Sequence, residues 1–223
     1  REWATLNPKA VMHSKETHPF GGPIDLETVL SSRPIAWPLN LLDCCLVTDH
    51  GGAVVIVSKE QATEYKNDPV WIEGSGEAIS HINMSQMEDM TMTSAHLSSK
   101  RAYEIAGMGP KDMEMAMLYD SFTYTAGVTA EMVGLAPRGE GTNLWKNGLA
   151  SPKGKFPINT NGGGLSYSHS GMYGMLLLVE AQRQLAGKAS GLEGRQTTAK
   201  SAIVNGTGGP LASTGTIILT VDR

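Results

Sequence analysis

The stretch NTNGGGLSYSHSGMYG, residues 159–174, is the most distinctive part of this 223-residue chain. Its three consecutive glycines allow positive φ angles and close approach of other groups to the backbone. His169 follows between two serines, and residues 175–186 then show apolar positions at helical spacing without Gly or Pro. We therefore expect a tight glycine loop that delivers His169 to the start of a helix, where backbone N–H groups favour developing negative charge. The alternative is an ordinary turn beside a hydrogen-bonded histidine.

The overall composition is that of a common globular protein. Hydrophobic residues make up 40% of the chain, and the formal net charge is -4. No basic block points to nucleic acid, and no apolar run is long enough to span a membrane. We find no signal peptide or lipidation motif, and the length suits one large domain or two small ones.

The two cysteines, Cys44 and Cys45, are adjacent. Neighbouring cysteines rarely pair, so we expect no disulfide framework and a reducing, cytoplasmic compartment. Their spacing from the histidines fits no zinc site, so no metal is expected. Since they lie in an apolar run without a basic neighbour to lower a thiol pKa, we predict that both are structural.

Short apolar runs alternate with helical patterns along the chain. The run 53–58 is β-branched and bounded by glycines on one side, which predicts a buried strand. Further strands are expected over 70–76, 113–120, 199–204 and 214–221, and helices over 1–18, 25–30, 59–65, 99–106, 123–133 and 175–186. This alternation predicts an α/β layered fold, with helices covering a largely buried sheet.

Three loops at the expected strand ends carry the candidate chemistry: 119–122, the His169 loop, and the glycine loop 205–210. In α/β sheets, binding sites collect at such ends. Tyr119 is either a proton donor to an oxyanion, or a base, or a packed core tyrosine. Asp120 is expected to cap the helix that follows it, with orientation of a base as the alternative. The 205–210 glycines either offer backbone N–H groups to an oxyanion or form a plain turn.

The order of these motifs resembles the C-terminal part of the thiolase superfamily. The motifs are YDSFT at 119–123, GEG at 139–141, SHSG at 168–171 and GTGG at 206–209, and SRP at 32–34 and LDC at 42–44 fit as well. The sequence is most similar to sterol-carrier-protein-x-type thiolases and bacterial thiolase-like lipid-transfer proteins. The resemblance implies a thiolase-like layered α/β fold of βαβαβαββ half-domains. Residues 1–68 would then be the end of the N-terminal half, and residues 69–223 the C-terminal half.

The resemblance also implies roles for individual residues. His169 matches the histidine of the family's Gly-His-Pro motif, which supports the oxyanion and the nucleophile; Ser168 and Ser170 replace the glycine and the proline. Tyr119 stands where the family has His or Asn, and Gly208 approximates a backbone oxyanion donor.

Two departures from the thiolase pattern matter. The family's second cysteine, a base near the last glycine loop, is absent, because Asn205 or Gly206 stands there. The nucleophilic cysteine belongs to the family's first half, and neither Cys44 nor Cys45 matches it. The chain therefore looks like the C-terminal portion of a split subunit pair or of a longer chain.

Three functions follow from the resemblance. Some members of the lipid-transfer branch are retro-aldolases that cleave the side chain of β-hydroxyacyl-CoA steroids and use tyrosines in place of His and Cys. On this hypothesis Tyr119 and Tyr167 transfer protons and His169 contacts the enolate. The first alternative is a thiolytic acetyl-CoA acyltransferase whose nucleophilic cysteine sits in the N-terminal half. The second is a non-catalytic scaffold that binds CoA thioesters.

The same resemblance sets expectations for cofactors and partners. No cofactor is expected to be tightly bound, and coenzyme A enters as part of the acyl-CoA substrate. The protein is expected to form a homodimer, or a heterotetramer with a small accessory protein that carries a zinc ribbon and an OB fold, and to associate with an N-terminal thiolase half if the two are separate chains. We also expect residues 1–223 alone not to form a stable monomer, because the apolar segment 53–57 would be left uncovered.

Overall fold

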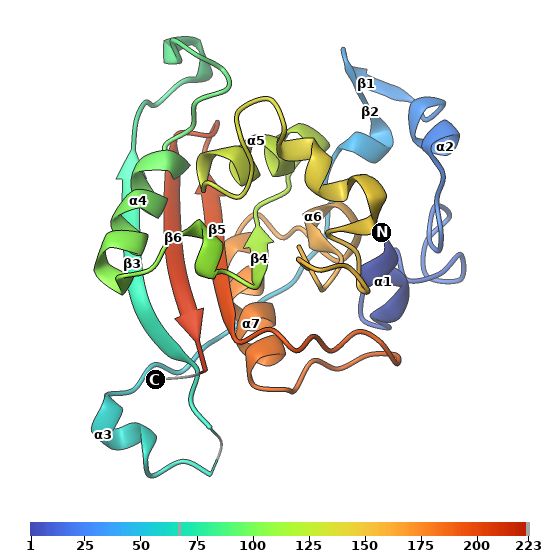
Figure 1. Ribbon diagram of the computed structural model, residues 1–223. Coiled ribbons are helices and arrows are strands. Elements are labelled where there is room, and N and C mark those ends of the chain that lie inside the picture. Colours follow the sequence, from blue (N-terminus) through green and yellow to red (C-terminus); the bar gives the residue numbers. More distant parts are fainter. Residues whose placement is uncertain (67, 222–223) are drawn as a thin grey trace.

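A mixed four-stranded sheet forms the centre of the computed structural model, which describes residues 1–66 and 68–221 (Figure 1). The strand order is β3-β6-β5-β4. β4 runs parallel to β5, while β6 is antiparallel to both of its neighbours. The strands are β3 Trp71–Ile79, β4 Met115–Leu118, β5 Ser201–Gly208 and β6 Ser213–Thr220.

The element order reproduces the expected βαβαβαββ half-domain. An isolated parallel bridge between Ala116 and Ile158 extends the sheet beyond β4 and takes the place of a third strand. Three helices connect the strands: α4 Ala95–Ala106, α5 Thr123–Met132 and α7 Tyr173–Leu185. The chain thus runs β3, α4, β4, α5, bridge, α7, β5, β6. The predicted α/β layered architecture is confirmed.

The sheet buries a different apolar cluster on each face, because successive side chains of a strand alternate between the two faces. On the α7 side, Met117 and Tyr119 pack with Val204 and with Leu177 of the helix. On the other side, Ala116 and Leu118 pack with Val128 of α5 and Ala102 of α4. This alternation decides which residues at the end of β4 face α7.

Helix α4 lies unusually close to the sheet. A β-carbon on Gly74 would stand 2.1 Å from the carbonyl oxygen of Ala102, and one on Gly76 would stand 2.2 Å from that of Ser98. The Ser98 hydroxyl shares hydrogen bonds of 2.8 Å with the hydroxyls of Thr214 and Thr216. Only glycine on β3 permits this packing.

The first 66 residues are mostly irregular. The expected helix over 1–18 ends at Leu6, because Asn7 adopts an extended conformation before Pro8. The helix over 25–30 is confirmed, and its Asp25 caps it through a bond from the Thr28 N–H. The elements of this region are α1 Glu2–Leu6, α2 Leu26–Leu30, β1 Pro34–Ala36, β2 Leu39–Asn40, η1 Leu41–Asp43 and α3 Lys59–Ala62.

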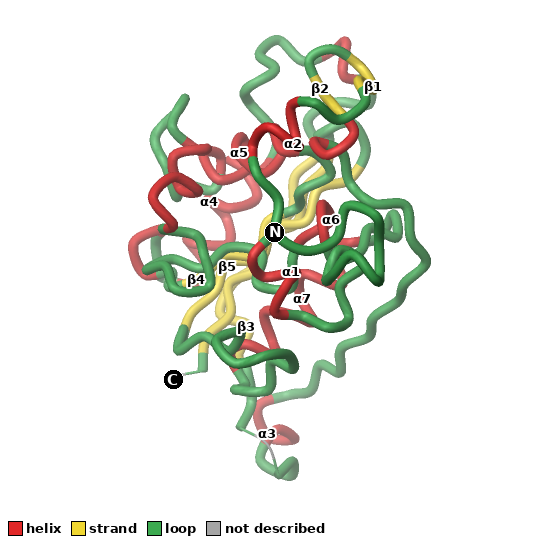
Figure 2. Tube along the Cα trace, turned by 90° about the vertical axis from the view of Figure 1, so that its right-hand side faces the viewer, coloured by secondary structure: helices red, strands yellow, loops and turns green. Residues whose placement is uncertain are grey.

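The prediction of a buried strand over 53–58 is wrong. This segment belongs to the long irregular run that leads down to α3 (Figure 2). Val55 is 83% exposed and Ile56 is 70% exposed. β-branched residues favour a strand only where a partner supplies backbone hydrogen bonds, and no strand among the described residues pairs with this segment.

The glycine loop expected over 205–210 begins later than predicted. β5 continues through Gly206 to Gly208 and pairs with β6 along its whole length, so the turn starts at Gly209. The short elements that remain are η2 Met84–Gln86, η3 Pro110–Asp112, η4 Gly141–Gly148 and α6 Gly163–Ser166. None of the helices in the described residues has the length and apolar character needed to cross a membrane.

Candidate active site

Three aromatic rings meet where β4 ends and α7 begins. The ring centroids of Tyr119 and His169 lie 5.4 Å apart in an edge-to-face arrangement. Tyr173 contacts both: its ring lies 5.6 Å from that of Tyr119 and stacks at 6.0 Å on that of His169. The structure therefore brings together two of the side chains singled out in the sequence and adds a third.

Tyr119 follows the last residue of β4 and is held by the sheet. Its backbone N–H donates to the carbonyl of Asn205 at 3.0 Å, and its side chain lies in the apolar cluster on the α7 side. Burial is the main cause that raises the pKa of Tyr119, while the backbone N–H of Tyr173 acts in the opposite direction. The phenol therefore rests in its protonated form, which can donate a proton.

His169 is held by the irregular run that crosses beneath it. Its backbone N–H donates to Thr48 Oγ1 at 2.9 Å, and the Thr48 and Ser168 hydroxyls share a bond of 2.7 Å. Its Nε2 is buried without a hydrogen-bond partner. Burial lowers the pKa of His169, so the imidazole is neutral near pH 7. A buried ring nitrogen without a partner is free to bind a substrate oxygen.

His169 does not lie at the start of the long helix as expected. The glycine loop opens the short helix α6, and α7 begins only at Tyr173. Tyr173 is fully buried, and its hydroxyl donates to Asn161 Oδ1 at 3.0 Å. No role for Tyr173 is predicted from the sequence, although an aromatic residue at the first helical position after a histidine loop is a signal that could have found it.

Asp120 faces the opposite side of the sheet from Tyr119. Its carboxylate accepts from the backbone N–H of Gly164 at 2.7 Å and of Leu165 at 3.4 Å, so it caps α6 from a distant part of the chain. The predicted cap of the following helix is wrong, because α5 has Phe122 at its N-cap without a side-chain bond. Burial raises the pKa of Asp120 to about 7.

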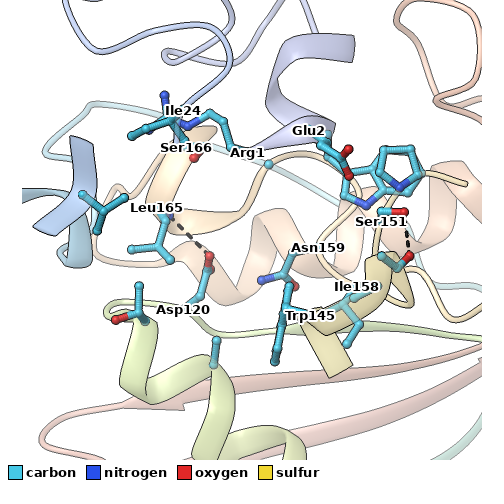
Figure 3. Close-up of a pocket in the computed structure, with 18 of the residues that line it drawn as sticks. Arg1, Glu2, Ile24, Asp120, Trp145, Ser151, Ile158, Asn159, Leu165 and Ser166 are labelled. Carbon is cyan, nitrogen blue, oxygen red and sulfur yellow. Dashed lines mark hydrogen bonds between the residues drawn. The ribbon is translucent and has the colours of Figure 1, made fainter. Parts of the chain in front are cut away.

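A cavity lies on the Asp120 side of the molecule. It has a volume of about 480 Å³ and is lined mainly by apolar side chains such as Trp145, Ile158 and Leu165, with Asp120 at its edge (Figure 3). Tyr119 and His169 do not line it. We therefore do not assign the chemistry of Tyr119 and His169 to this cavity.

Two other predicted site residues, Tyr167 and Gly208, have their partners outside the cluster of three rings. The Tyr167 hydroxyl lies 3.3 Å from Nε2 of His50, and the two ring centroids are 5.2 Å apart. Among the described residues, no ring contact joins Tyr167 to Tyr119. Gly208 stands opposite Ser213 in the β5–β6 ladder, and strand alternation directs its N–H toward β6. The proposed roles of Tyr167 and Gly208 thus remain predictions.

The two cysteines lie beside this region. Cys45 donates its backbone N–H to the carbonyl of Ser121 at 2.8 Å, and Cys44 Sγ lies 3.4 Å from the carbonyl of Asn40. Burial raises the pKa of both thiols, so both stay protonated near pH 7. This is the opposite of what an activated nucleophile needs. Among residues 1–66 and 68–221, no three His, Cys, Asp or Glu side chains converge to hold a metal ion.

A groove of about 430 Å³ opens in front of Tyr119. It runs past Met172 and Met175 at the start of α7, and over β5 and β6 to Glu77 and Ile79 on β3. It is therefore the concave surface that adjoins the aromatic cluster.

Comparison with known proteins identifies the family of the chain. Residues 76–221 match the family model described as thiolase C-terminal domain-like. The chain belongs to the thiolase superfamily. Thiolase-type relatives include a 17-hydroxy-3-oxo-4-pregnene-20-carboxyl-CoA lyase of Mycobacterium tuberculosis, which is 33% identical over 84% of this chain and 47% of the relative. An acetyl-CoA acetyltransferase of Methanothermobacter thermautotrophicus is 30% identical over 95% of this chain and 54% of the relative.

A solved thiolase-like structure, an Ltp2-ChsH2(DUF35) aldolase, superimposes with a TM-score of 0.82 at 29% identity. The match covers 100% of this chain and 56% of that chain. The chain thus spans about half the length of the thiolase relatives that it matches.

Proposed function

We propose that this chain forms part of a thiolase-like acyl-CoA carbon–carbon lyase that cleaves a β-hydroxyacyl-CoA by a retro-aldol reaction. The observation that carries the proposal is the contact between Tyr119 and His169, a protonated phenol beside a neutral imidazole whose Nε2 has no partner. The similarity to a pregnene-carboxyl-CoA lyase and to an aldolase structure supports the same chemistry.

The two side chains suit the steps of a retro-aldol cleavage. The bond between the α- and β-carbons breaks, its electron pair forms the thioester enolate, and the β-carbon becomes a carbonyl. His169 donates from Nε2 to the enolate oxygen, which stabilises the developing charge. Because the Tyr119 phenol rests protonated, it acts as a relay: its oxygen takes the proton of the β-hydroxyl as its own proton passes to the α-carbon. The proton lost by the β-hydroxyl is matched by the one gained at the α-carbon, and the reaction needs no acyl-enzyme intermediate.

A thiolytic acyltransferase is the less favoured alternative. Thiolysis needs a second base near the last glycine turn, and Asn205 there is buried with its Nδ2 bonded to Thr216 Oγ1 at 2.8 Å. An amide in that position cannot move a proton as a thiolate does. The non-catalytic scaffold is not favoured either, because the Tyr119 phenol lines an open groove and its ring contacts that of His169, whose buried Nε2 has no partner.

The cofactor and partner proposals follow from this function. Coenzyme A enters as the carrier of the substrate, and no cofactor is bound tightly. We expect a dimer or a heterotetramer with a small accessory protein that carries a zinc ribbon and an OB fold, together with an N-terminal thiolase half. The similarity to the Ltp2-ChsH2(DUF35) aldolase, whose name joins two components, supports an accessory subunit.

The test is a substrate panel for the complete protein. β-Hydroxyacyl-CoA substrates should be cleaved without free CoA, and Tyr119→Phe should lower the rate about 10²–10⁴-fold while leaving folding intact. His169→Ala should lower it about 10²–10³-fold. Cleavage of β-ketoacyl-CoA alone, with a requirement for free CoA, would establish the acyltransferase instead. If both variants keep full turnover on every substrate, the site assignment is wrong.

A further inference from the structure

Residues 44–50, which we call the bridging segment, connect the two loops that carry the candidate chemistry. At its start the segment is bound to the loop that follows β4. The Cys45 N–H donates to the carbonyl of Ser121 at 2.8 Å, and the residue before Cys45 forms an isolated antiparallel bridge with Phe122. These contacts lie two and three residues after Tyr119, so this end of the segment is fixed relative to the phenol.

The other end of the bridging segment lies along the stretch that carries the imidazole. Leu46 donates its N–H to the carbonyl of Gly164 at 3.0 Å, and His50 Nε2 lies 3.3 Å from the Tyr167 hydroxyl. Thr48 stands between these two contacts and faces the same stretch. Every second residue thus contacts it, as expected where a chain is extended. The segment therefore joins the two loops through hydrogen bonds at both ends.

Thr48 makes the contact nearest to the imidazole. Its Oγ1 accepts from the His169 N–H at 2.9 Å and shares a bond of 2.7 Å with the Ser168 hydroxyl. The His169 ring packs edge to face on Tyr119, and its Nε2 has no hydrogen-bond partner. With no bond to hold that nitrogen, its position depends on the backbone that carries the ring. That backbone is bound by the Thr48 hydroxyl.

The bridging segment lies outside residues 76–221, which match the family model. We propose that Thr48 is a positioning residue of the lyase reaction, whose hydroxyl fixes the backbone of His169 and so holds the imidazole against the Tyr119 phenol. The inference rests on the proposed lyase function, because it adds a residue that acts through His169. A misplacement of about 1 Å in a reacting group can cost 10²-fold in rate.

The experiment compares Thr48→Val and Thr48→Ser in the complete protein. Valine keeps the shape of threonine but has no hydroxyl, whereas serine keeps the hydroxyl. In Thr48→Val, kcat for a β-hydroxyacyl-CoA should fall about 10²-fold with KM within a few-fold. Thr48→Ser should keep kcat within a few-fold of the unchanged protein. A kcat that is unaltered in Thr48→Val, or lost equally in both variants, would overturn the proposal.

Ser201→Ala is the matched control. The Ser201 hydroxyl also bonds two groups: it accepts from the Glu114 N–H at 3.0 Å and donates to the carbonyl of Asp112 at 2.6 Å. It lies beside the start of β4, whereas Tyr119 follows the end of that strand. Ser201→Ala should lower the midpoint of thermal unfolding, as Thr48→Val does, and leave kcat unchanged. An equal loss of kcat in both would show that lost stability, and not misplacement, lowers the rate.

A double substitution tests whether Thr48 acts through His169. If it does, adding Thr48→Val to His169→Ala should lower kcat no further, because no imidazole is left to position. Multiplication of the two separate losses would overturn the proposal.

A readout without substrate separates this inference from the lyase function. If the unchanged protein cleaves no β-hydroxyacyl-CoA, the lyase function fails, and NMR titration of His169 still tests the contact. Burial lowers the pKa of His169. Thr48→Val should loosen the loop and raise that pKa toward the usual value of 6.5, and Ser201→Ala should not. An unchanged pKa in Thr48→Val would show that the hydroxyl does not hold the ring in place.

Discussion

The carboxylate of Asp120 fills the place that a side chain of Gly163 would occupy. A β-carbon on Gly163 would stand 2.0 Å from Asp120 Oδ2. Gly163 also has a φ of +72°, in the left-handed region that L side chains rarely adopt. The contact explains why the turn that leads to His169 is built of glycine.

Gly163→Ala is therefore expected to destabilise the fold by about 2–4 kcal/mol, from backbone strain together with the clash. Gly139 is the matched control, because it has a similar φ of +81° but nothing within 4 Å of its missing β-carbon. Gly139→Ala should cost only about 1 kcal/mol. Urea unfolding of both variants measures the difference, and equal costs would show that the carboxylate moves aside freely.

Asp120 should make the folded protein less stable as the pH rises, which is the opposite of the usual effect of a carboxyl group. Burial raises its pKa from 3.8 to about 7 in the folded state. The protonated carboxyl thus favours folding, a contribution that is fully present below about pH 4 and is lost as the pH rises through about 7. Three pKa units correspond to roughly 4 kcal/mol. Asp120→Asn should remove that part of the slope, as measured by urea unfolding across this range. An unaltered slope would assign the pH dependence to other groups.

Tyr173 is predicted to position the catalytic pair. Tyr173→Phe removes only the bond to Asn161, so we expect a stability loss of about 1–2 kcal/mol and little change in kcat. Tyr173→Leu removes the ring contacts with Tyr119 and His169 and should lower kcat about 10²-fold with little change in KM. Steady-state kinetics of the two variants separate these effects. A loss of kcat in Tyr173→Phe as large as in Tyr173→Leu would indicate that the hydroxyl itself takes part in chemistry.

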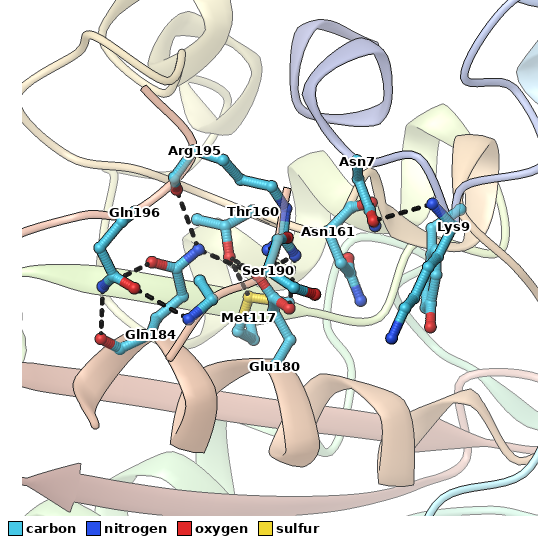
Figure 4. A network of polar contacts seen from close by, with 12 residues as sticks. Asn7, Lys9, Met117, Thr160, Asn161, Glu180, Gln184, Ser190, Arg195 and Gln196 are labelled. Atoms are coloured by element: carbon cyan, nitrogen blue, oxygen red, sulfur yellow. Dashed lines mark hydrogen bonds and ion pairs between the residues drawn. The ribbon is translucent and has the colours of Figure 1, made fainter. Parts of the chain in front are cut away.

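The buried ion pair between Glu180 and Arg195 holds Thr160, near the start of the glycine-rich stretch 159–174. Arg195 Nη2 lies 2.7 Å from both oxygens of the carboxylate, and the Thr160 hydroxyl donates to Oε1 at 2.7 Å (Figure 4). The side chain of Arg195 is only 3% exposed and that of Glu180 only 4%. Glu180→Gln leaves the guanidinium unpaired and should cost about 3–5 kcal/mol.

An exposed pair provides the comparison. Lys100 and Glu104 on α4 are 4.0 Å apart and 74% and 65% exposed, so Glu104→Gln should change stability by less than about 1 kcal/mol. Chemical unfolding of the two glutamine variants gives both values. Similar small losses would mean that water reaches Arg195 in solution.

Cys44 and Cys45 are predicted to be dispensable for chemistry. Because burial raises the pKa of both thiols, each should react with iodoacetamide more slowly than a free cysteine peptide at the same pH. The double substitution to serine should retain turnover within a few-fold in the complete protein. A loss of several orders of magnitude without unfolding would identify one of them as the nucleophile.

Local patterns predicted the elements that carry their own signals. The apolar spacing of α7, the glycine that closes α5 at Gly134, and the buried run of β4 are visible in the sequence and present in the structure. Residues 53–57 carry an equally strong strand signal and form none, because strand formation depends on a partner that no local pattern reveals.

For the candidate site too, the sequence predicted some of the residues, and only the fold revealed the others. Tyr119 was found because it follows the apolar run of β4, and His169 because it follows the three glycines at 162–164. Thr48, which holds the backbone of His169, lies about 120 residues earlier in the chain, and only the fold brings the two together. The partner of Asp120 was missed for the same reason, since α6 is distant in sequence.

Tyr119 and Asp120 are consecutive residues, yet Tyr119 lines the groove and Asp120 caps α6. The pairing of Leu118 with Asn205 keeps them apart. Deletion of a single residue within β4 would turn each side chain to the opposite face, placing a carboxylate beside the imidazole and a phenol beneath the glycine turn. This short strand thus tolerates no change of length, and insertions or deletions there would abolish function even where the chain still folds.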